Sequence, residues 1–543
     1  MKLIFISGGV ISGIGKGITA ASLGLLLEKQ GYKVSFLKCD PYINIDAGTM
    51  NPIEHGEVFV TDDGYEMDMD GGHYERFMGI SVSKVNAITT GQIYSKVIQN
   101  ERNLKYDGAC VEVIPHIRDE IVSRIGEAYN HDEILIIEIG GTIGEYQNDI
   151  YYEAERYLKR KLKEDLLHIH ISYLPVPKSI GEMKTKPTQQ SVMHLNQRGI
   201  FPDIIVGRSD SPIDKLRRKK IAVATNVEED CVFSNTDVSS IYKVPYNFYL
   251  QKLDIKVLDF LNLKSKDVDM EDWKALISSI DTDYKKTITI GMVGKYHMSG
   301  SFSLEDAYVS VVESIKIACW SEKINFKIKW LDSENINMKV LKTCNGIIVP
   351  GGFGKRGIEG KIKAIRYARE NNIPYFGLCY GMQLATVEFA RNVIGLKKAN
   401  SEEVNPKTPD PVIHIMPDQE KKLLVKDYGG SMRLGAWECI LSKNTLVYKA
   451  YKKDRISERH RHRYEFNNKY RKVFEKSGVV FSGLSLDSKL VEIMELKDHP
   501  FFVGVQFHPE FKSKPLFPHP LFVEFISNCI KNKGGETQDD TIR

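Results

Sequence analysis

The sequence lacks the features that mark a disulfide-bonded, zinc-binding or membrane-spanning protein. Its eight cysteines are scattered and none forms a Cys-x-x-Cys pair, which argues against a disulfide framework and fits a reducing cytoplasm. No apolar run approaches the roughly 20 residues that cross a bilayer. The formal net charge is only +4 over 543 residues, which indicates no bias toward nucleic acid or membranes. We therefore expect a cytoplasmic protein without nucleic-acid or membrane partners.

The chain is too long for a single hydrophobic core, so we expect at least two domains. Short, continuous β-branched runs alternate with helical patterns in both halves, as in parallel sheets covered on both faces. Segment 264–286 is charged and poor in apolar residues, and we interpret it as a linker. The prediction is an α/β protein with a first domain over 1–265, a linker over 266–286, a second domain over 287–530 and a polar tail over 531–543. The strands are predicted at 3–7, 33–38, 134–138, 167–174, 204–208, 287–293, 346–350, 374–379 and 501–507.

Cys379 lies between two glycines, where an apolar run ends and a helical pattern begins. A cysteine on such a strand-to-helix turn is held clear of the sheet, and the helix dipole favours its thiolate. Taken alone it is equally well a buried structural cysteine. However, a Phe-His-Pro-Glu string closes the next strong strand, so His508 is a candidate base and Glu510 its orienting carboxylate. The sequence therefore predicts a Cys-His-Glu site that hydrolyses an amide.

A glycine loop over 7–17 separates the first strand from a helix at 18–30 and ends in Lys16. Such a loop directs backbone N–H groups at a phosphate, and the lysine adds a charge. It departs from the usual P-loop, since Val10 stands where the first glycine belongs and Gly17 replaces the Ser or Thr that helps to hold magnesium. The metal therefore needs other oxygen ligands, and we expect Mg²⁺ on Asp70 and Glu138.

Two further groups favour a nucleotide triphosphate. Lys38 ends the second predicted strand and is a candidate partner of the transferred phosphate. Segment 184–190 offers two lysines and two amides around a proline, with an ordinary surface turn as the alternative. An amide hydrolase joined to such a half indicates an ATP-driven amination that takes its nitrogen from glutamine. Composition and spacing leave the acceptor open.

Long strings of the chain resemble the CTP synthase family, from the first strand to about Phe525. They include Lys-Thr-Lys-Pro-Thr-Gln and Arg-His-Arg-Tyr-Glu-Phe-Asn, and they lie at 8–17, 40–50, 55–64, 72–77, 184–189, 349–354 and 461–467. The resemblance implies a P-loop domain like that of dethiobiotin synthetase and a flavodoxin-like class I glutamine amidotransferase domain. It implies that ATP phosphorylates O4 of UTP and that ammonia from L-glutamine displaces the phosphate to give CTP.

The resemblance also assigns binding residues in the first half. Those implied for ATP are Gly13, Ile14, Gly15, Lys16, Gly17, Ile18, Lys38, Asp70, Thr236, Asp237 and Val238. Those implied for UTP or CTP are Ser12, Glu145, Tyr146, Gln147, Lys184, Thr185, Lys186, Pro187, Thr188, Gln189 and Lys220.

In the second half it implies that Cys379 forms a glutamyl thioester and that the N–H groups of Gly351 and Tyr380 hold the oxyanion. The implied glutamine contacts are Gly352, Tyr380, Gly381, Met382, Gln383, Glu403 and Arg463. His55 is a candidate gate for ammonia. GTP as activator, CTP as inhibitor, a homotetramer and filaments are further family properties, and Phe353, Arg356 and the string 433–435 fall in the GTP-responsive regions.

The chain departs from the family in three places. Glu145-Tyr-Gln stands where many members have Asp-Ile-Glu, Thr236 replaces a commoner lysine, and the loop after Tyr296 is longer than usual. The alternatives are an amidotransferase of the cobyrinic or cobyric acid type, and a filament-forming scaffold with reduced catalysis.

Overall fold

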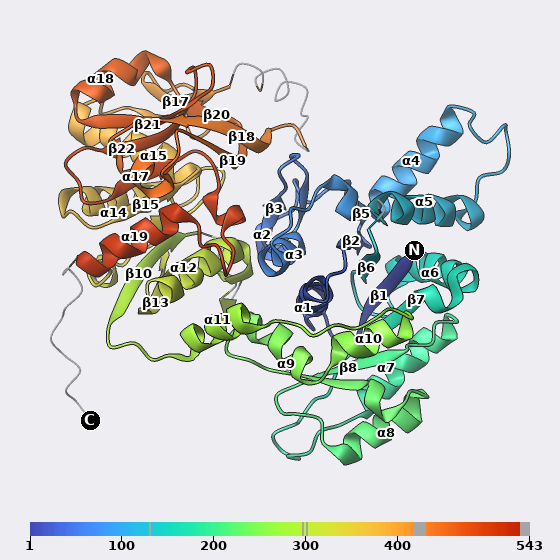
Figure 1. The fold of residues 1–543 in the computed structure, drawn as a ribbon. Coiled ribbons are helices and arrows are strands. Elements are labelled where there is room, and N and C mark those ends of the chain that lie inside the picture. The colour runs from blue at the N-terminus through green and yellow to red at the C-terminus, as the bar shows by residue number, and fades with distance from the viewer. Residues whose placement is uncertain are drawn as a thin grey trace. The chain divides into compact units, whose positions relative to one another are not determined.

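The computed structural model describes residues 1–129, 132–295, 298–299, 302–303, 305–416, 419 and 430–532. It divides into two compact units (Figure 1). The first comprises Met1–Asp46 and Asp70–Ser278, and the second comprises Ala47–Met69 and Ser279–Arg543. The polar tail predicted at 531–543 lies almost entirely outside the described residues.

The first unit is built on a seven-stranded sheet in the order β5-β2-β6-β1-β7-β8-β9, and every neighbouring pair is parallel. Continuous apolar runs such as Ile-Leu-Ile-Ile in β6 are buried on both faces of this sheet, as parallel strands require. The strands are β1 (Lys2–Gly9), β2 (Val34–Asp40), β5 (Ala87–Thr89), β6 (Ile134–Ile139), β7 (Leu166–Tyr173), β8 (Ile204–Ser209) and β9 (Val232–Thr236). The parallel sheet was predicted, whereas β5 and β9 were not.

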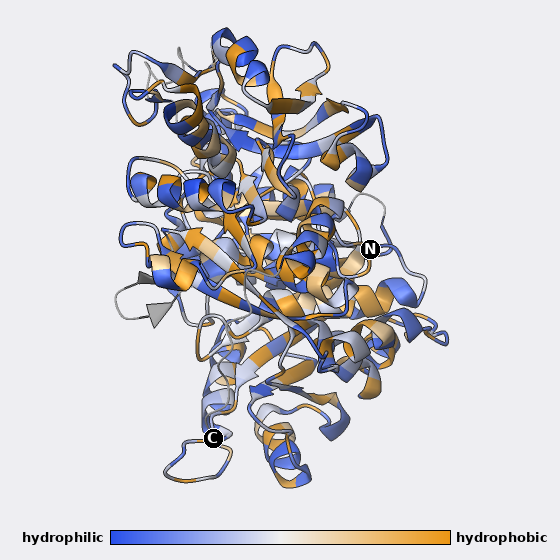
Figure 2. Cartoon of the chain, turned by 90° about the vertical axis from the view of Figure 1, so that its left-hand side faces the viewer, coloured by the Kyte–Doolittle hydropathy of each residue, from blue (hydrophilic) through white to orange (hydrophobic). Residues whose placement is uncertain are grey.

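Helices connect the parallel strands of the first unit and supply its core. Their faces mix hydrophobic and hydrophilic residues, which Figure 2 shows as alternating orange and blue along the ribbons. They are α1 (Lys16–Lys29), α3 (Asp70–Met78), α4 (Thr90–Arg102), α5 (Arg118–Tyr129), α6 (Asp149–Leu162), α7 (Lys186–Gln197), α8 (Lys215–Thr225), α9 (Val244–Leu250) and α10 (Leu253–Phe260).

The second unit is built on a nine-stranded mixed sheet in the order β13-β10-β14-β15-β23-β22-β21-β18-β19. The first five strands are parallel, and pairing is antiparallel from β23 onward. The strands are β10 (Thr287–Gly294), β13 (Asn325–Asp332), β14 (Gly346–Val349), β15 (Tyr375–Leu378), β18 (Arg433–Leu441), β19 (Arg455–His462), β21 (Val479–Ser485), β22 (Val491–Leu496) and β23 (Phe502–Val505). The strands β10, β14, β15 and β23 were predicted, whereas β13 and the antiparallel strands β18, β19, β21 and β22 were not, because polar or charged residues interrupt their apolar runs.

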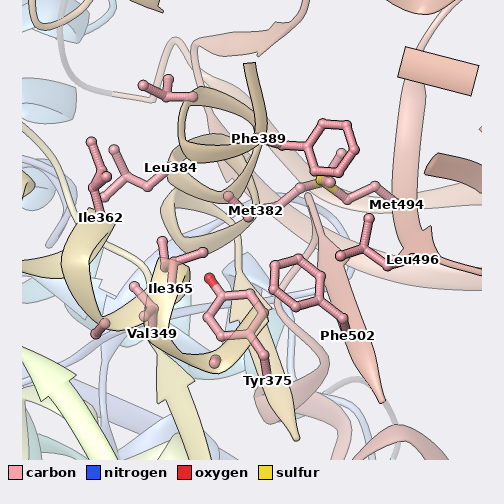
Figure 3. Close-up of a cluster of buried hydrophobic side chains, with 14 of the residues drawn as sticks. Val349, Ile362, Ile365, Tyr375, Met382, Leu384, Phe389, Met494, Leu496 and Phe502 are labelled. Carbon is pink, nitrogen blue, oxygen red and sulfur yellow. The ribbon is translucent and has the colours of Figure 1, made fainter. Parts of the chain in front are cut away.

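Helix α15 (Tyr380–Phe389) lies at the centre of one of the cores of this unit. Figure 3 shows Met382 and Phe389 directed toward Met494, and Leu384 toward Ile362. Tyr375 and Phe502 from adjacent strands stack with ring centroids 4.5 Å apart. The remaining helices are α12 (Val309–Ser321), α13 (Met338–Leu341), α14 (Ile358–Glu370), α17 (Leu446–Tyr451), α18 (Arg471–Lys476) and α19 (Pro520–Lys531).

Two features of the division were not anticipated. Segment 47–69, with α2 (Pro52–His55), β3 (Val58–Val60) and β4 (Glu66–Asp68), belongs to the second unit. The segment predicted as a linker contains α11 (Glu271–Asp281), in which Trp273 is buried and donates to the carbonyl of Tyr242 at 2.7 Å. The limits of the two compact units thus differ from those of the predicted domains, 1–265 and 287–530. The domain limits remain a prediction.

The segment 455–463, which is rich in arginine and histidine, forms β19 and the residue after it, and two of its arginines are paired with carboxylates. Arg459 is 1 % exposed, and its Nε donates to Asp62 at 2.6 Å. The Nε of Arg461 donates to Glu66 at 2.7 Å. Both carboxylates come from segment 47–69, so ion pairs fix this segment on the second unit. Within the described part of the chain, no helix is long and apolar enough to cross a membrane.

Candidate active sites

Cys379 occupies a sharp turn between β15 and α15. Its φ is +49°, a left-handed conformation that costs a non-glycine residue of order 1–3 kcal/mol. The turn is held because the N–H of Cys379 donates to the carbonyl of Val505 on the neighbouring strand β23 at 2.7 Å. The thiol therefore stands at the carboxyl edge of the sheet and at the N-terminus of a helix, where a negative charge is favoured.

His508 reaches the same edge because it follows β23, the parallel neighbour of β15. Its Nδ1 lies 2.7 Å from Oε1 of Glu510, and both side chains are buried. Burial opposes the imidazolium, but the charges of Glu510 and Cys379 outweigh it and raise the pKa of His508 to about 10. Nε2 of His508 has no hydrogen-bond partner among the described residues. The predicted triad is thus assembled with an imidazolium beside the sulfur of Cys379, and its catalytic role remains a prediction.

The thiol has two further neighbours that the sequence did not reveal. Nε2 of Gln506 approaches the sulfur at 3.6 Å, and the thiol donates to the carbonyl of Arg461 at 3.7 Å. Gln506 lies two residues before His508, so a Gln-x-His pattern at the end of a strand was the available signal. Gly351 is packed against the base, since a Cβ there would lie 2.9 Å from Cε1 of His508.

A cavity of about 70 Å³ is lined by Cys379, His508 and Glu510. Segment 47–69 contributes Pro52, Glu57 and Val58 to its wall, and Gly351, Gly352, Phe353 and Arg461 line it as well. The cavity holds more than one molecule the size of water or ammonia. His55 does not line it, and its Nδ1 lies 3.9 Å from a carboxylate oxygen of Asp68.

The predicted glutamine contacts lie around this turn, with one exception. Gln383 is buried, donates to the carbonyl of Tyr464 at 2.9 Å and leaves its own Oε1 without a partner among the described residues. Glu403 accepts from the N–H of Gly354 at 2.5 Å, and burial raises its pKa. Arg463 contacts Gln419 and Ser431 at 3.1 and 3.0 Å. The side chain of Met382 packs in the core instead (Figure 3), so only its backbone remains for the predicted role.

In the first unit, the phosphate loop follows β1 and leads into α1. Val10 has a φ of +80°, so the backbone keeps the left-handed turn of a P-loop although a valine replaces its glycine. Nζ of Lys16 donates to the carbonyl of Gly141 at 2.7 Å, and burial lowers the pKa of this lysine. Gly17 allows Asp70 to approach the loop, because a Cβ there would lie 2.0 Å from Oδ1 of Asp70.

Lys38 holds both predicted metal ligands. Its Nζ donates to Asp70 and, at 2.9 Å, to Oε1 of Glu138, while Tyr74 donates to the other oxygen of Glu138. Burial would raise the pKa of Asp70, but the charge of Lys38 outweighs it and lowers the pKa. Burial and the charge of Asp70 together raise the pKa of Glu138.

These carboxylates fit a cation that also binds phosphate oxygens. Mg²⁺ would stabilise the buried Glu138 and the partly buried Asp70, which repel each other, and retained waters and phosphates usually complete its oxygen shell. Among the described residues, no cluster of three or more His, Cys, Asp or Glu side chains would hold a metal alone.

Comparison with known proteins supplies the family. Residues 2–263 match the model of the CTP synthase N-terminus, and residues 303–528 match that of class I glutamine amidotransferase. The chain is 49 % identical over 538 residues to CTP synthase of Geobacillus kaustophilus, covering 98 % of this chain and 99 % of that protein. The chain belongs to the CTP synthase family. It is also 50 % identical over 540 residues to CTP synthase of Caldanaerobacter subterraneus subsp. tengcongensis, with the same shares covered. The glutaminase domain of Trypanosoma brucei CTPS with bound acivicin is 38 % identical, with a TM-score of 0.42, over 45 % of this chain and 95 % of that one.

Members of the CTP synthase family are glutamine-hydrolysing ligases that use ATP and UTP. The residues predicted to bind UTP all belong to the first unit. Lys186 begins α7 and is exposed, and Nζ of Lys184 pairs with Glu182 at 2.8 Å. Thr188 is fully buried and accepts from Ser172 at 2.9 Å, so its hydroxyl is engaged inside the fold. Lys220 is exposed on α8. Glu145 accepts from the N–H of Thr142 at 2.9 Å and from Gln147 at 3.0 Å.

The structure adds Arg208 to the CTP synthase phosphate loop. Thr236 ends β9, and the following Asp237 accepts from Nε of Arg208 at 2.6 Å. A Cβ on Gly15 would lie 3.1 Å from Nη1 of Arg208, so this arginine lies against the loop. Its position at the carboxyl end of the parallel strand β8 was the signal that sequence reasoning missed.

Proposed function

We propose that the first unit phosphorylates O4 of UTP with ATP, and that ammonia released at Cys379 replaces this phosphate to give CTP. The observation that carries the proposal is the assembly of Cys379, His508 and Glu510 at one sheet edge, in a chain whose other unit gathers Lys16, Lys38, Asp70 and Glu138. Phosphoryl transfer requires positioning and charge neutralisation, which these lysines supply. Mg²⁺ on Asp70 and Glu138 would neutralise charge on the phosphates.

At the glutaminase site, the thiolate of Cys379 attacks the side-chain carbonyl of glutamine. The N–H groups of Gly351 and Tyr380 stabilise the oxyanion, His508 protonates the departing ammonia, and a glutamyl thioester remains. Water then hydrolyses the thioester with His508 as the base. Glu510 orients the imidazole through Nδ1, which leaves Nε2 for these proton transfers.

Substrate recognition follows from the same residues. Arg463 and Glu403 bind the α-carboxylate and α-ammonium groups of glutamine, and Oε1 of Gln383, which has no partner among the described residues, accepts from the substrate. The cavity beside Cys379 provides room for the released ammonia. His55, which lies outside the lining of this cavity, gates the further passage of ammonia. In the first unit, Ser12, the residues 184–189 and Lys220 bind UTP.

Regulation is part of the proposal. GTP activates glutamine hydrolysis and CTP competes with UTP. The protein works as a homotetramer in the cytoplasm and is able to form filaments.

The GTP contacts are not assigned to single residues, because much of the loop after Tyr296 lies outside the described residues. Arg433 of the string 433–435 forms a buried ion pair with Glu492 at 2.7 Å, which leaves Leu434 and Gly435 as the candidates in that string. Gln147, which stands where many relatives have an acid, donates to Glu145. CTP inhibition should therefore be weaker than in relatives with Asp-Ile-Glu. Equal inhibition constants measured side by side would contradict this.

The proposal is tested by measuring CTP formation from UTP and ATP with glutamine or with ammonia. Cys379→Ala should abolish the glutamine-dependent reaction and keep the ammonia-dependent one, whereas Lys16→Ala should abolish both. Cys319→Ala, at another buried cysteine of the second unit, is the matched control and should retain both reactions. A Cys379→Ala protein that still uses glutamine would disprove the nucleophile. A wild-type protein that assembles filaments but forms no CTP would favour a scaffold.

A further inference from the structure

Five buried polar side chains form a continuous hydrogen-bonded chain inside the first unit. Oγ of Ser7 lies 2.8 Å from Nε2 of His168 and 2.8 Å from Nδ1 of His170. Nδ1 of His168 lies 2.6 Å from Oε1 of Glu155, and Nε2 of His170 lies 2.6 Å from Oγ of Ser191. All five residues are at most 4 % exposed. We call this set the polar chain.

Every link of the polar chain can hold one proton: Nδ1–H of His168 donates to Glu155, and the hydroxyl of Ser7 accepts from one imidazole and donates to the other. Burial and the charges of His168 and Lys16 hold the pKa of His170 well below its ordinary value, so His170 takes part as a neutral imidazole. Both ends of the chain are buried, so it is a fixed structural element and not a route for protons to solvent.

The polar chain joins the elements that carry the proposed nucleotide contacts. Ser7 lies on β1, three residues before Val10 of the phosphate loop, and pairs in register with His170 on β7. Ser191 lies on α7, whose first turn carries Lys186, and Glu155 lies on α6, which follows the loop of Glu145 and Gln147. Gly9 packs directly on the far end, because a Cβ there would lie 1.6 Å from Oγ of Ser191. A shift of any one element would therefore break a buried hydrogen bond.

We propose that Ser7, His168 and His170 are positioning residues that hold the phosphate loop in register with α7 and α6, the helices next to the proposed UTP and CTP contacts. Ser7 is the central member, since its hydroxyl is hydrogen-bonded to both imidazoles. Its loss would leave two buried ring nitrogens without partners, which a packed interior tolerates only by moving. This inference rests on the proposed function, because it assigns ATP to the phosphate loop, and UTP or CTP to the first turn of α7 and to the loop before α6.

The test compares Ser7→Ala with Ser7→Thr, which keeps the hydroxyl, using ammonia as the nitrogen donor. Ser7→Ala should raise KM for both ATP and UTP about 10-fold and change kcat less than about 3-fold, and Ser7→Thr should restore both KM values. Ser22→Ala is the control, since Ser22 is a fully buried serine of α1 whose hydroxyl has no partner among the described residues. It should leave both KM values unchanged.

A second variant protects the test against misfolding. Ser191→Ala removes only the last link and should raise KM for UTP about 3-fold. Unchanged KM values in Ser7→Ala, or a fall in kcat alone, would overturn the inference. Direct titration with ATP separates this failure from that of the proposed function. If the wild type binds ATP but makes no CTP, the proposed function fails, whereas a roughly 10-fold weaker ATP affinity of Ser7→Ala would still support the polar chain.

Discussion

The two sites of this chain hold their reactive groups in different ways. In the first unit, Lys38 joins Asp70 and Glu138 through ion pairs between β2, α3 and β6. In the second unit, Cys379 and His508 are placed by adjacent parallel strands, a left-handed turn and a close glycine. The first arrangement depends on the pairing of charges, whereas the second depends on the shape of the backbone.

The two units also differ in the surroundings of their buried lysines. Lys38 is surrounded by carboxylates, whereas Lys361 on α14 is fully buried and its Nζ has no hydrogen-bond partner among the described residues. Nζ of Lys361 lies 5.4 Å from the ring centre of Tyr380. Burial, together with the charge of Lys295, lowers the pKa of Lys361 to about 7. A buried lysine is thus paired with carboxylates in the first unit, whereas the one in the second unit has no hydrogen-bond partner among the described residues.

The largest effect is expected from Lys38→Met, which removes the cation between the buried carboxylate of Glu138 and the partly buried carboxylate of Asp70. We expect the free energy of unfolding to fall by about 3–5 kcal/mol, and CTP formation from either nitrogen source to fall by at least about 100-fold. Denaturant melts and initial rates measure both. Lys29→Met, which breaks a partly exposed pair with Asp272, should cost at most about 1 kcal/mol.

If the carboxylate pair is the metal site, Mg²⁺ should raise the melting temperature of Lys38→Met more than that of the wild type. An equal rise in both proteins would remove the metal assignment.

Lys361→Met tests the opposite case, the loss of an unpaired buried cation. The pKa of Lys361 is about 7 in the folded state and 10.5 in the unfolded state. Between these pH values the unfolded state binds more protons than the folded state. The loss of folding stability that Lys361 causes therefore shrinks as the pH rises from 7 to 10.5. At about 1.4 kcal/mol per unit, the variant should gain stability on the order of 4 kcal/mol at pH 7 and about half of that at pH 9. Urea melts at the two pH values measure this gain. Lys363→Met, at an exposed position of the same helix, is the control and should change stability by at most about 0.5 kcal/mol. A loss of stability in Lys361→Met would instead show that its ammonium group has a counter-ion.

Gly351→Ala tests whether backbone shape alone places the base of the second unit. The added Cβ would lie 2.9 Å from the ring of His508, so the imidazole must shift. We expect glutamine-dependent CTP formation to fall about 30-fold, which corresponds to about 2 kcal/mol of transition-state stabilisation, while ammonia-dependent formation stays within about 2-fold. Gly126→Ala in α5 meets no atom within 4 Å and should instead add about 0.5–1 kcal/mol of stability. Equal losses with glutamine and ammonia would show that the damage is not local.

The smallest effect is expected from Val10→Gly, which tests strain in the phosphate loop. A β-branched residue at φ +80° is strained, and glycine removes the strain at the expense of a more flexible unfolded chain. We expect a net gain of about 1 kcal/mol in the free energy of unfolding, read from the urea midpoint. A lower midpoint would indicate that the contacts of the valine side chain outweigh its backbone strain.

Local patterns predicted much of both sites. Cys379 and His508 each end an apolar run, and such runs become parallel strands whose carboxyl ends meet. The phosphate loop was predicted from its position between a strand and a helix, despite Val10 and Gly17. Strand β9 was missed because its Val-Phe-Ser-Asn-Thr run is short and half polar. The antiparallel strands were missed because polar or charged residues interrupt their apolar runs.

The sequence by itself determined the family, the two α/β units and the residue types at each site, because these depend on local periodicity and on long matching strings. Only the tertiary structure decided that segment 47–69 lines the Cys379 cavity, that Lys38 holds both acids, that Lys361 is buried, and that Ser7 links two histidines. Each of these facts depends on residues distant in the chain, and their meeting is fixed by strand order and by the pairing of buried charges.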